Sequence, residues 1–194
     1  MNNKTTKAYI LVALIFASVF AVAKNPLSGK YVLVIDIQEI WTRQLMSPEE
    51  SKLLIENVNS IIGYAETEKV IYIETVAANL RLNFNGISVG FPEGLQLDDR
   101  LMIVNSNKII KNKPNSFSSD QLRSFIKTHQ ASEFVVVGLF AEHCVLETLL
   151  GGLKLGYKMA IIPEAIAGSS VESKTKALET SKQNGVEIIL LHSI

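Results

Sequence analysis

The sequence predicts a single-domain α/β fold, in which a mostly parallel sheet carries helices on both faces. Short, continuous apolar runs alternate with stretches of helical periodicity, which is the pattern of buried parallel strands joined by helices. No shift in composition, repeat or low-complexity tract divides residues 24–194. We therefore expect one domain over these residues, with its chemistry at the carboxyl ends of the strands.

The strand candidates are short runs rich in valine and isoleucine. The run FVVVGL at 134–139 is the strongest candidate for a central strand, because its β-branched residues suit a strand buried on both faces. The predicted strands cover residues 31–37, 69–75, 102–104, 109–111, 134–139, 158–162 and 186–191.

Capping signals mark the predicted helices. Ser47, Pro48 and Glu50 form a capping box with proline at the first helical position, and apolar residues follow at helical spacing to residue 65. A second helix begins at Ser119 or Asp120. Two more, at about 142–155 and 172–184, each end before a glycine, and Gly151-Gly152 inside the first of them predicts close packing. Residues 76–100 are predicted to form a long irregular connection, which in compact domains often serves function.

Residues 1–23 have the pattern of a cleavable signal peptide. Lys4 and Lys7 precede an apolar run at about 8–20, and Ala21-Val22-Ala23 follows. The run is shorter than the ~20 residues that span a membrane. We expect cleavage before Lys24 and a periplasmic or secreted protein without membrane contact; an uncleaved anchor is the alternative.

The charge balance does not favour a nucleic-acid partner. Without residues 1–23 the chain has 17 basic and 19 acidic residues, a formal charge of −2. Its basic residues are scattered, whereas nucleic-acid binders gather them on one face. We therefore expect no nucleic-acid partner.

Three reactive side chains stand at the ends of predicted strands: Asp36, Lys111 and Cys144. Because parallel strands end at the same edge of a sheet, these side chains can converge. A carboxylate inside a run of valines and isoleucines is also costly unless it is paired or lies at an opening.

Cys144 is the chain's single cysteine. In an exported protein it cannot form an internal disulfide, so it is either an inert core residue or a nucleophile. The first turn of the predicted helix would favour a thiolate and lower its pKa. His143 is a poor base for it, since adjacent residues on a helix do not face each other.

The sequence offers no metal or cofactor motif. Its three histidines are dispersed, and no glycine-rich phosphate loop follows the first two strands. We therefore expect neither a metal nor an organic cofactor.

These residues resemble the isochorismatase-like cysteine hydrolases, which include nicotinamidases, ureidoacrylate and maleamate amidohydrolases, and N-carbamoylsarcosine amidase. The most specific similarity is VVVGLFAEHCVLETLLGGLKLGYKMAIIPEAIA at 135–167; VLVIDIQ at 32–38 and KNKPNSFSSDQL at 111–122 accompany it. The resemblance implies a Rossmann-like three-layer sandwich over residues 24–194, and a homo-oligomer, either a dimer or a tetramer.

The resemblance also implies a catalytic triad of Asp36, Lys111 and Cys144. The family's lysine stands six residues before the phenylalanine of the Pro-Asn-Ser-Phe segment, here Phe117. Lys113 is the alternative, because residues two apart on an extended chain share a face.

Further site features follow from the same resemblance. It implies a cis peptide bond between Leu139 and Phe140, and an oxyanion hole formed by the backbone N–H groups of Ala141 and Cys144. It places Trp41 in the substrate pocket, with Gln38 and Phe140 as additional substrate contacts. Trp41 could instead cover the edge of the core.

The chain also departs from some relatives. Nicotinamidases bind a metal through an aspartate and histidines after the second strand, yet residues 76–105 contain no histidine. Isochorismate-cleaving relatives lack the cysteine. We therefore expect an exported cysteine hydrolase that cleaves a C–N bond in a small amide, carbamoyl or ureide substrate through a thioester. The alternatives are a thiol redox sensor, a ligand-binding member of the same fold, and a scaffold with a buried thiol.

Overall fold

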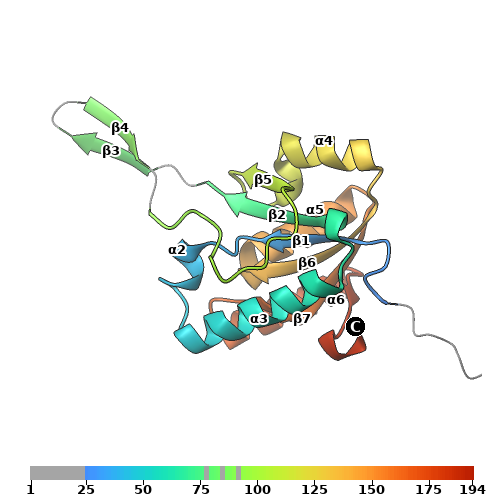
Figure 1. Ribbon diagram of the computed structural model, residues 1–194. Helices are drawn as coiled ribbons and strands as arrows, with labels where there is room; N and C mark the ends of the chain where they lie inside the picture. Colours follow the sequence, from blue (N-terminus) through green and yellow to red (C-terminus); the bar gives the residue numbers. More distant parts are fainter. Residues whose placement is uncertain (1–24, 77–78, 84–85, 91–92) are drawn as a thin grey trace, which may run out of the picture.

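The computed structural model describes residues 25–194, except 77–78, 84–85 and 91–92 (Figure 1). The predicted signal peptide, residues 1–23, lies outside the described residues. Among those described, none of the helices combines the length and apolar character needed to cross a membrane.

A six-stranded sheet forms the centre of the fold, with the strand order β5-β2-β1-β6-β7-β8. All of its strand pairs are parallel. Every residue of β1 is buried, as is every residue of β6 after its first, which explains why these runs are continuously apolar. The strands are β1 (Tyr31–Ile35), β2 (Val70–Thr75), β5 (Lys108–Lys111), β6 (Glu133–Leu139), β7 (Lys158–Ala167) and β8 (Glu187–Ile188).

Helices cover both faces of this sheet, so the predicted three-layer α/β architecture is confirmed (Figure 1). One core joins β1, β2 and β6 to α3 (Pro48–Tyr64) through Leu54, Val58 and Ile61. The core on the opposite face contains residues of α4 (Asp120–His129), α5 (Leu146–Lys154) and α6 (Val171–Gln183). A short helix, α2 (Glu39–Thr42), follows β1.

The start of α3 is the one that its sequence predicts. The Ser47 side chain accepts a hydrogen bond from the Glu50 N–H, and the Glu50 carboxylate accepts one from the Ser47 N–H. This capping box satisfies two backbone donors that the first turn would otherwise leave unpaired.

Three predicted strands are wrong or shortened. The strand predicted at 31–37 ends at Ile35, because the backbone leaves the extended conformation at Asp36. Residues 102–104 form no strand: the Tyr72 hydroxyl donates to Met102 O and accepts from Val104 N–H, and Asn59 accepts from Met102 N–H. Side chains therefore pair with the backbone N–H and C=O groups that a strand would use to pair with its neighbour. Of the predicted strand at 186–191 only β8 pairs, and a 3₁₀ turn (Leu191–Ser193) follows.

Two other segments are more regular than their sequences indicate. β7 extends beyond residue 162 to Ala167, and an irregularity in its pairing with β6 accommodates Pro163. The connection at 76–100 contains an antiparallel hairpin, β3 (Asn79–Asn83) and β4 (Gly86–Gly90), which stands apart from the main sheet (Figure 1).

Candidate active site

Asp36 is the first residue after β1, and the backbone changes direction there. Its φ of 56° lies in the left-handed region, which aspartate tolerates better than most residues. Its N–H donates to Ile73 O on β2 at 2.9 Å, so the turn remains tied to the sheet. The residue is 3% exposed. A buried carboxylate is thereby held at the carboxyl edge of the sheet.

Close approach of β6 to β1 accompanies this turn. Gly138 pairs with Ile35, and a Cβ placed on Gly138 would lie 2.0 Å from Ile35 O. The glycine also has a φ of 117°, which side chains rarely adopt. The glycine that interrupts the valine run therefore lets the strand that leads to Cys144 pass directly beside Asp36.

Cys144 lies in a π-helical turn, Ala141–Val145, between β6 and α5. The expectation of a regular helix from residue 142 is corrected by this finding, because α5 begins only at Leu146. The peptide bond between Leu139 and Phe140 is cis, as the resemblance implied.

Backbone donors in this turn are partly used by the turn itself. The N–H groups of His143 and Val145 both donate to Phe140 O, at 3.0 and 3.3 Å. These two donors are therefore engaged, whereas the predicted oxyanion donors are the N–H groups of Ala141 and Cys144. Their role stays a prediction.

The segment after Lys111 packs tightly against α5. A Cβ on Gly151 would come within 2.2 Å of the Asn115 amide nitrogen. The Ser116 N–H donates to the buried Thr148 hydroxyl at 3.0 Å. The glycine pair thus permits the close packing expected of it, and this contact ties the segment that follows Lys111 to the helix that follows Cys144.

Lys111 contacts the other two predicted catalytic residues, Asp36 and Cys144. Its Nζ donates to Asp36 Oδ2 at 2.9 Å and to Cys144 Sγ at 3.2 Å. The Lys111 side chain is fully buried and that of Asp36 is 4% exposed, whereas Cys144 is half-buried. The charged pair is therefore enclosed, whereas the cysteine is partly exposed. Lys113, the alternative lysine, is exposed.

A fourth residue, Thr75 at the end of β2, completes this group. Its hydroxyl donates to Asp36 Oδ1 at 2.9 Å and accepts from Lys111 Nζ at 2.6 Å. We call Asp36, Thr75, Lys111 and Cys144 the site network. Sequence reasoning missed Thr75 because threonine is uncharged and common in strands, so nothing in the local sequence singles it out.

The thiol pKa differs from the sequence-based expectation. Burial, followed by the charge and hydrogen bond of Asp36, raises the pKa of Cys144 to about 11, and Lys111 opposes this only in part. The expectation that a helix terminus lowers this pKa is therefore wrong. The resting group is a protonated thiol at neutral pH, which needs a base to become a nucleophile.

The predicted substrate contacts occupy two environments. Trp41 and Phe140 form an edge-to-face aromatic pair with ring centroids 6.3 Å apart, and the buried Trp41 indole N–H has no hydrogen-bond partner among the described residues. Gln38 is fully buried, and its amide bonds to the N–H and C=O of Thr75 and to Leu95 O. The substrate-binding role of all three stays a prediction.

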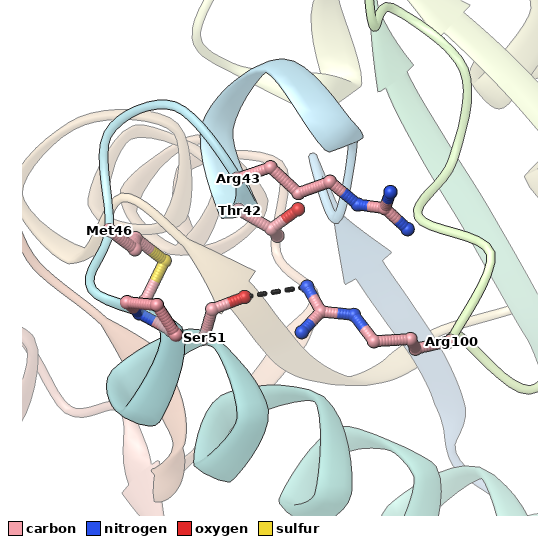
Figure 2. A pocket seen from close by; sticks show the side chains of 6 residues that line it. Thr42, Arg43, Met46, Ser51 and Arg100 are labelled. Carbon is pink, nitrogen blue, oxygen red and sulfur yellow. Dashed lines mark hydrogen bonds between the residues drawn. The ribbon is translucent and has the colours of Figure 1, made fainter.

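A cavity of about 300 Å³ is lined by Thr42, Ser51 and Arg100 among others (Figure 2). All three of these side chains belong to a hydrogen-bond network with a second buried carboxylate, Asp98. Arg100 donates to both oxygens of Asp98, at 2.8 and 2.7 Å, and to the Ser51 hydroxyl. The Thr42 hydroxyl also donates to Asp98. Burial alone would raise the pKa of Asp98, but these hydrogen bonds outweigh it and hold that pKa well below its ordinary value. We call Thr42, Ser51, Asp98 and Arg100 the anchor network.

The fold and the site define a class: an α/β protein with a cysteine at the carboxyl edge of a parallel sheet, beside a buried Asp–Lys pair. A family model for the isochorismatase domain matches residues 30–193. The chain therefore belongs to the isochorismatase family, which comprises hydrolases.

Individual relatives agree with this assignment. The chain is 26% identical over 180 residues to a probable inactive nicotinamidase from Arabidopsis thaliana, covering 83% of this chain and 92% of that protein. Among solved structures, an isochorismatase from Pseudomonas putida has a TM-score of 0.71 at 16% identity, covering 87% of this chain and 91% of that one. The zinc complex of Pyrococcus horikoshii pyrazinamidase has a TM-score of 0.64 at 21% identity, covering 83% and 98%. The structural similarities confirm the fold.

The zinc belongs to the Pyrococcus protein. Within the described part of this chain, no group of three or more His, Cys, Asp or Glu side chains is arranged to hold a metal ion. The segment 76–105 also lacks histidine. Because the donor set does not fit, we derive no chemical step through a metal.

Proposed function

We propose that this chain is a cysteine hydrolase that cleaves the C–N bond of a small amide, carbamoyl or ureide compound. One observation carries the proposal: a single buried ammonium, Lys111, contacts both a carboxylate and the sulfur of a partly exposed cysteine. This arrangement supplies a base and a nucleophile and balances the charge that moves between them.

In the first half-reaction, the Asp36 carboxylate takes the proton of the Cys144 thiol. The thiolate, stabilised by Lys111, attacks the substrate carbonyl carbon to form a C–S bond. The protonated Asp36 then gives its proton to the leaving nitrogen, the C–N bond breaks, and an amine or ammonia departs from a thioester. Because burial and the charge of Asp36 raise the pKa of the thiol, the thiol holds its proton at neutral pH, and the scheme needs this transfer to form the nucleophile.

In the second half-reaction, water attacks the thioester and gives a proton to Asp36. The C–S bond breaks, the acid product leaves, and the sulfur regains its proton. The backbone N–H groups of Ala141 and Cys144 would hold the oxyanion in both halves, which is worth about 3 kcal/mol per donor in comparable sites. Trp41 and Phe140 would contact the planar part of the substrate.

The test is an activity screen over nicotinamide, carbamoyl and maleamate-like amides, with ammonia or amine release as the readout. We expect turnover of at least one compound by the parent protein, and none by Cys144→Ala or Asp36→Asn. Turnover that survives in both variants would contradict the mechanism.

A second candidate is a member of the same fold that binds a ligand without turnover. It is favoured by one observation, the Arabidopsis relative described as probably inactive. Substrate depletion without product, or a melting-temperature shift with no turnover of any amide, would support it. A redox sensor is less favoured, because oxidant sensing relies on a low-pKa thiolate and burial raises the pKa of Cys144.

We also propose export and self-association, both from the sequence. N-terminal sequencing of the protein recovered from the periplasm or medium should begin at Lys24. Light scattering on the purified chain should give the mass of a dimer or tetramer.

A further inference from the structure

The position of Thr75 follows from the strand order. β2 lies between β1 and β5 in the sheet. Asp36 follows β1 directly, and Thr75 pairs with Lys111 across β2 and β5. The last residue of β2 must therefore lie between the carboxylate and the ammonium, whatever its identity.

In this position the Thr75 hydroxyl contacts both charged groups. It donates its one proton to Asp36 Oδ1 and accepts from Lys111 Nζ. The Lys111 ammonium has three N–H donors, and these go to Asp36, Thr75 and Cys144. Each donor thus has a separate acceptor, and the direction of the one aimed at sulfur is fixed by the other two.

The backbone of Thr75 is held as firmly as its side chain. The Gln38 side chain accepts from the Thr75 N–H at 2.9 Å and donates to the Thr75 C=O at 3.1 Å. Gln38 is fully buried, two residues after Asp36. The same turn that presents the carboxylate therefore fixes the hydroxyl that contacts it.

From these contacts we infer that Thr75 is a positioning residue of the proposed hydrolase. Its hydroxyl holds the Lys111 ammonium and the Asp36 carboxylate in the orientation in which both act on the Cys144 sulfur. The inference rests on the proposed function for its kinetic consequence, although the alignment of Lys111 on sulfur does not require turnover. Thr75 exchanges no proton with substrate in this scheme.

Thr75→Val tests the inference, because it keeps the branched shape and removes the hydroxyl. With an amide identified in the screen, we expect kcat to fall about 10²-fold, the cost typical of misplaced catalytic groups, with a smaller change in KM. Because Lys111 lowers the pKa of Cys144, loss of its alignment should also move the pH profile of iodoacetamide labelling to higher pH.

Two variants separate positioning from general damage. Thr75→Ser restores the hydroxyl, and should recover both the labelling profile and most of kcat. Thr175→Val makes the same change at an exposed position of α6, where the hydroxyl donates to Val171 O, and should alter neither. If Thr75→Val does not fold, Thr75→Ala with the same serine comparison serves instead.

The outcomes distinguish this inference from the proposed function. Parent-like turnover and labelling in Thr75→Val, with Cys144→Ala inactive, would overturn the role of Thr75 and leave the hydrolase intact. Turnover that survives Cys144→Ala would overturn the hydrolase, while a shifted labelling profile in Thr75→Val would still support the positioning role. Failure of serine to restore the profile would reduce Thr75 to a packing residue.

Discussion

The site network and the anchor network have the same ingredients and use them differently. In each, a buried aspartate accepts hydrogen bonds from a cation and from a threonine hydroxyl. In the anchor network Arg100 directs two of its donors at one carboxylate, a rigid and bidentate contact. In the site network Lys111 divides its donors among three groups, one of which is sulfur.

The site network and the anchor network also differ in how deeply their cations are buried. The Lys111 side chain has no exposed surface, whereas that of Arg100 is 38% exposed. A fully buried ammonium is expensive unless every donor is satisfied, and its charge is felt strongly by neighbouring groups. The anchor network thus suits holding α2 and α3 to the segment around residue 98, and the site network suits controlling the charge on a thiol.

The largest expected effect comes from removing the buried cation. Lys111→Met leaves the Asp36 carboxylate enclosed without its partner, so we expect the free energy of unfolding to fall by about 3–5 kcal/mol. Turnover should fall on the order of 10⁴-fold. The pKa of Cys144 should rise further, because Lys111 lowers it. Urea unfolding, kinetics and labelling by iodoacetamide measure the three effects.

Arg100→Met is the matched variant in the anchor network. Because Arg100 is partly exposed, its loss should cost less, about 1–3 kcal/mol, and leave the labelling profile unchanged. Equal losses of stability in the two variants would contradict the distinction by burial.

Asp36→Asn should separate thiol reactivity from catalysis. Asp36 raises the pKa of Cys144 through its charge and hydrogen bond, so its replacement by a neutral amide should lower that pKa and speed labelling near neutral pH. Turnover should nevertheless be lost, because the asparagine amide cannot take the thiol proton and then give it to the leaving nitrogen. Asp98→Asn should leave labelling unchanged. Unchanged labelling in Asp36→Asn would show that the carboxylate does not act on the sulfur, and slower labelling would show that it promotes the reactivity of the thiol instead.

Much of the fold is predictable because local and global signals agree. The valine-rich runs become central strands, and the capping box at Ser47 starts α3. One failure occurs where side chains replace backbone partners, at residues 102–104, where Tyr72 takes the hydrogen bonds. That competition depends on residues 30 positions apart and leaves no local pattern.

The candidate site is likewise predictable in part from the sequence. Strand ends indicate Asp36, Lys111 and Cys144, and the structure brings them together. Thr75 required the strand order, because only the placement of β2 between β1 and β5 puts it between the charged partners. The raised thiol pKa required burial, which outweighs the expected effect of a helix terminus.

A smaller effect is expected from Asp98→Asn, and it depends on pH. The pKa of Asp98 is held below its ordinary value of 3.8, so its contribution to stability is present above that pH and is lost as pH falls below it. We expect the variant to be less stable by about 1–3 kcal/mol near neutral pH. The difference between variant and parent should shrink by about pH 3 in urea unfolding. A difference that stays constant with pH would assign Asp98 a packing role instead.

The smallest effect is expected from Lys113→Met, the matched control for Lys111→Met. A β-strand would place both lysines on one face, but β5 ends at Lys111, and Lys113 lies in the bend that follows and is exposed. Its loss should change stability by no more than about 0.5 kcal/mol and leave turnover and the labelling profile unaltered. Lost turnover in Lys113→Met, with Lys111→Met unaffected, would assign the catalytic role to Lys113 instead of Lys111. The buried contact of Lys111 with sulfur would then be a structural feature, and Lys113 would be the cation that stabilises the thiolate during turnover.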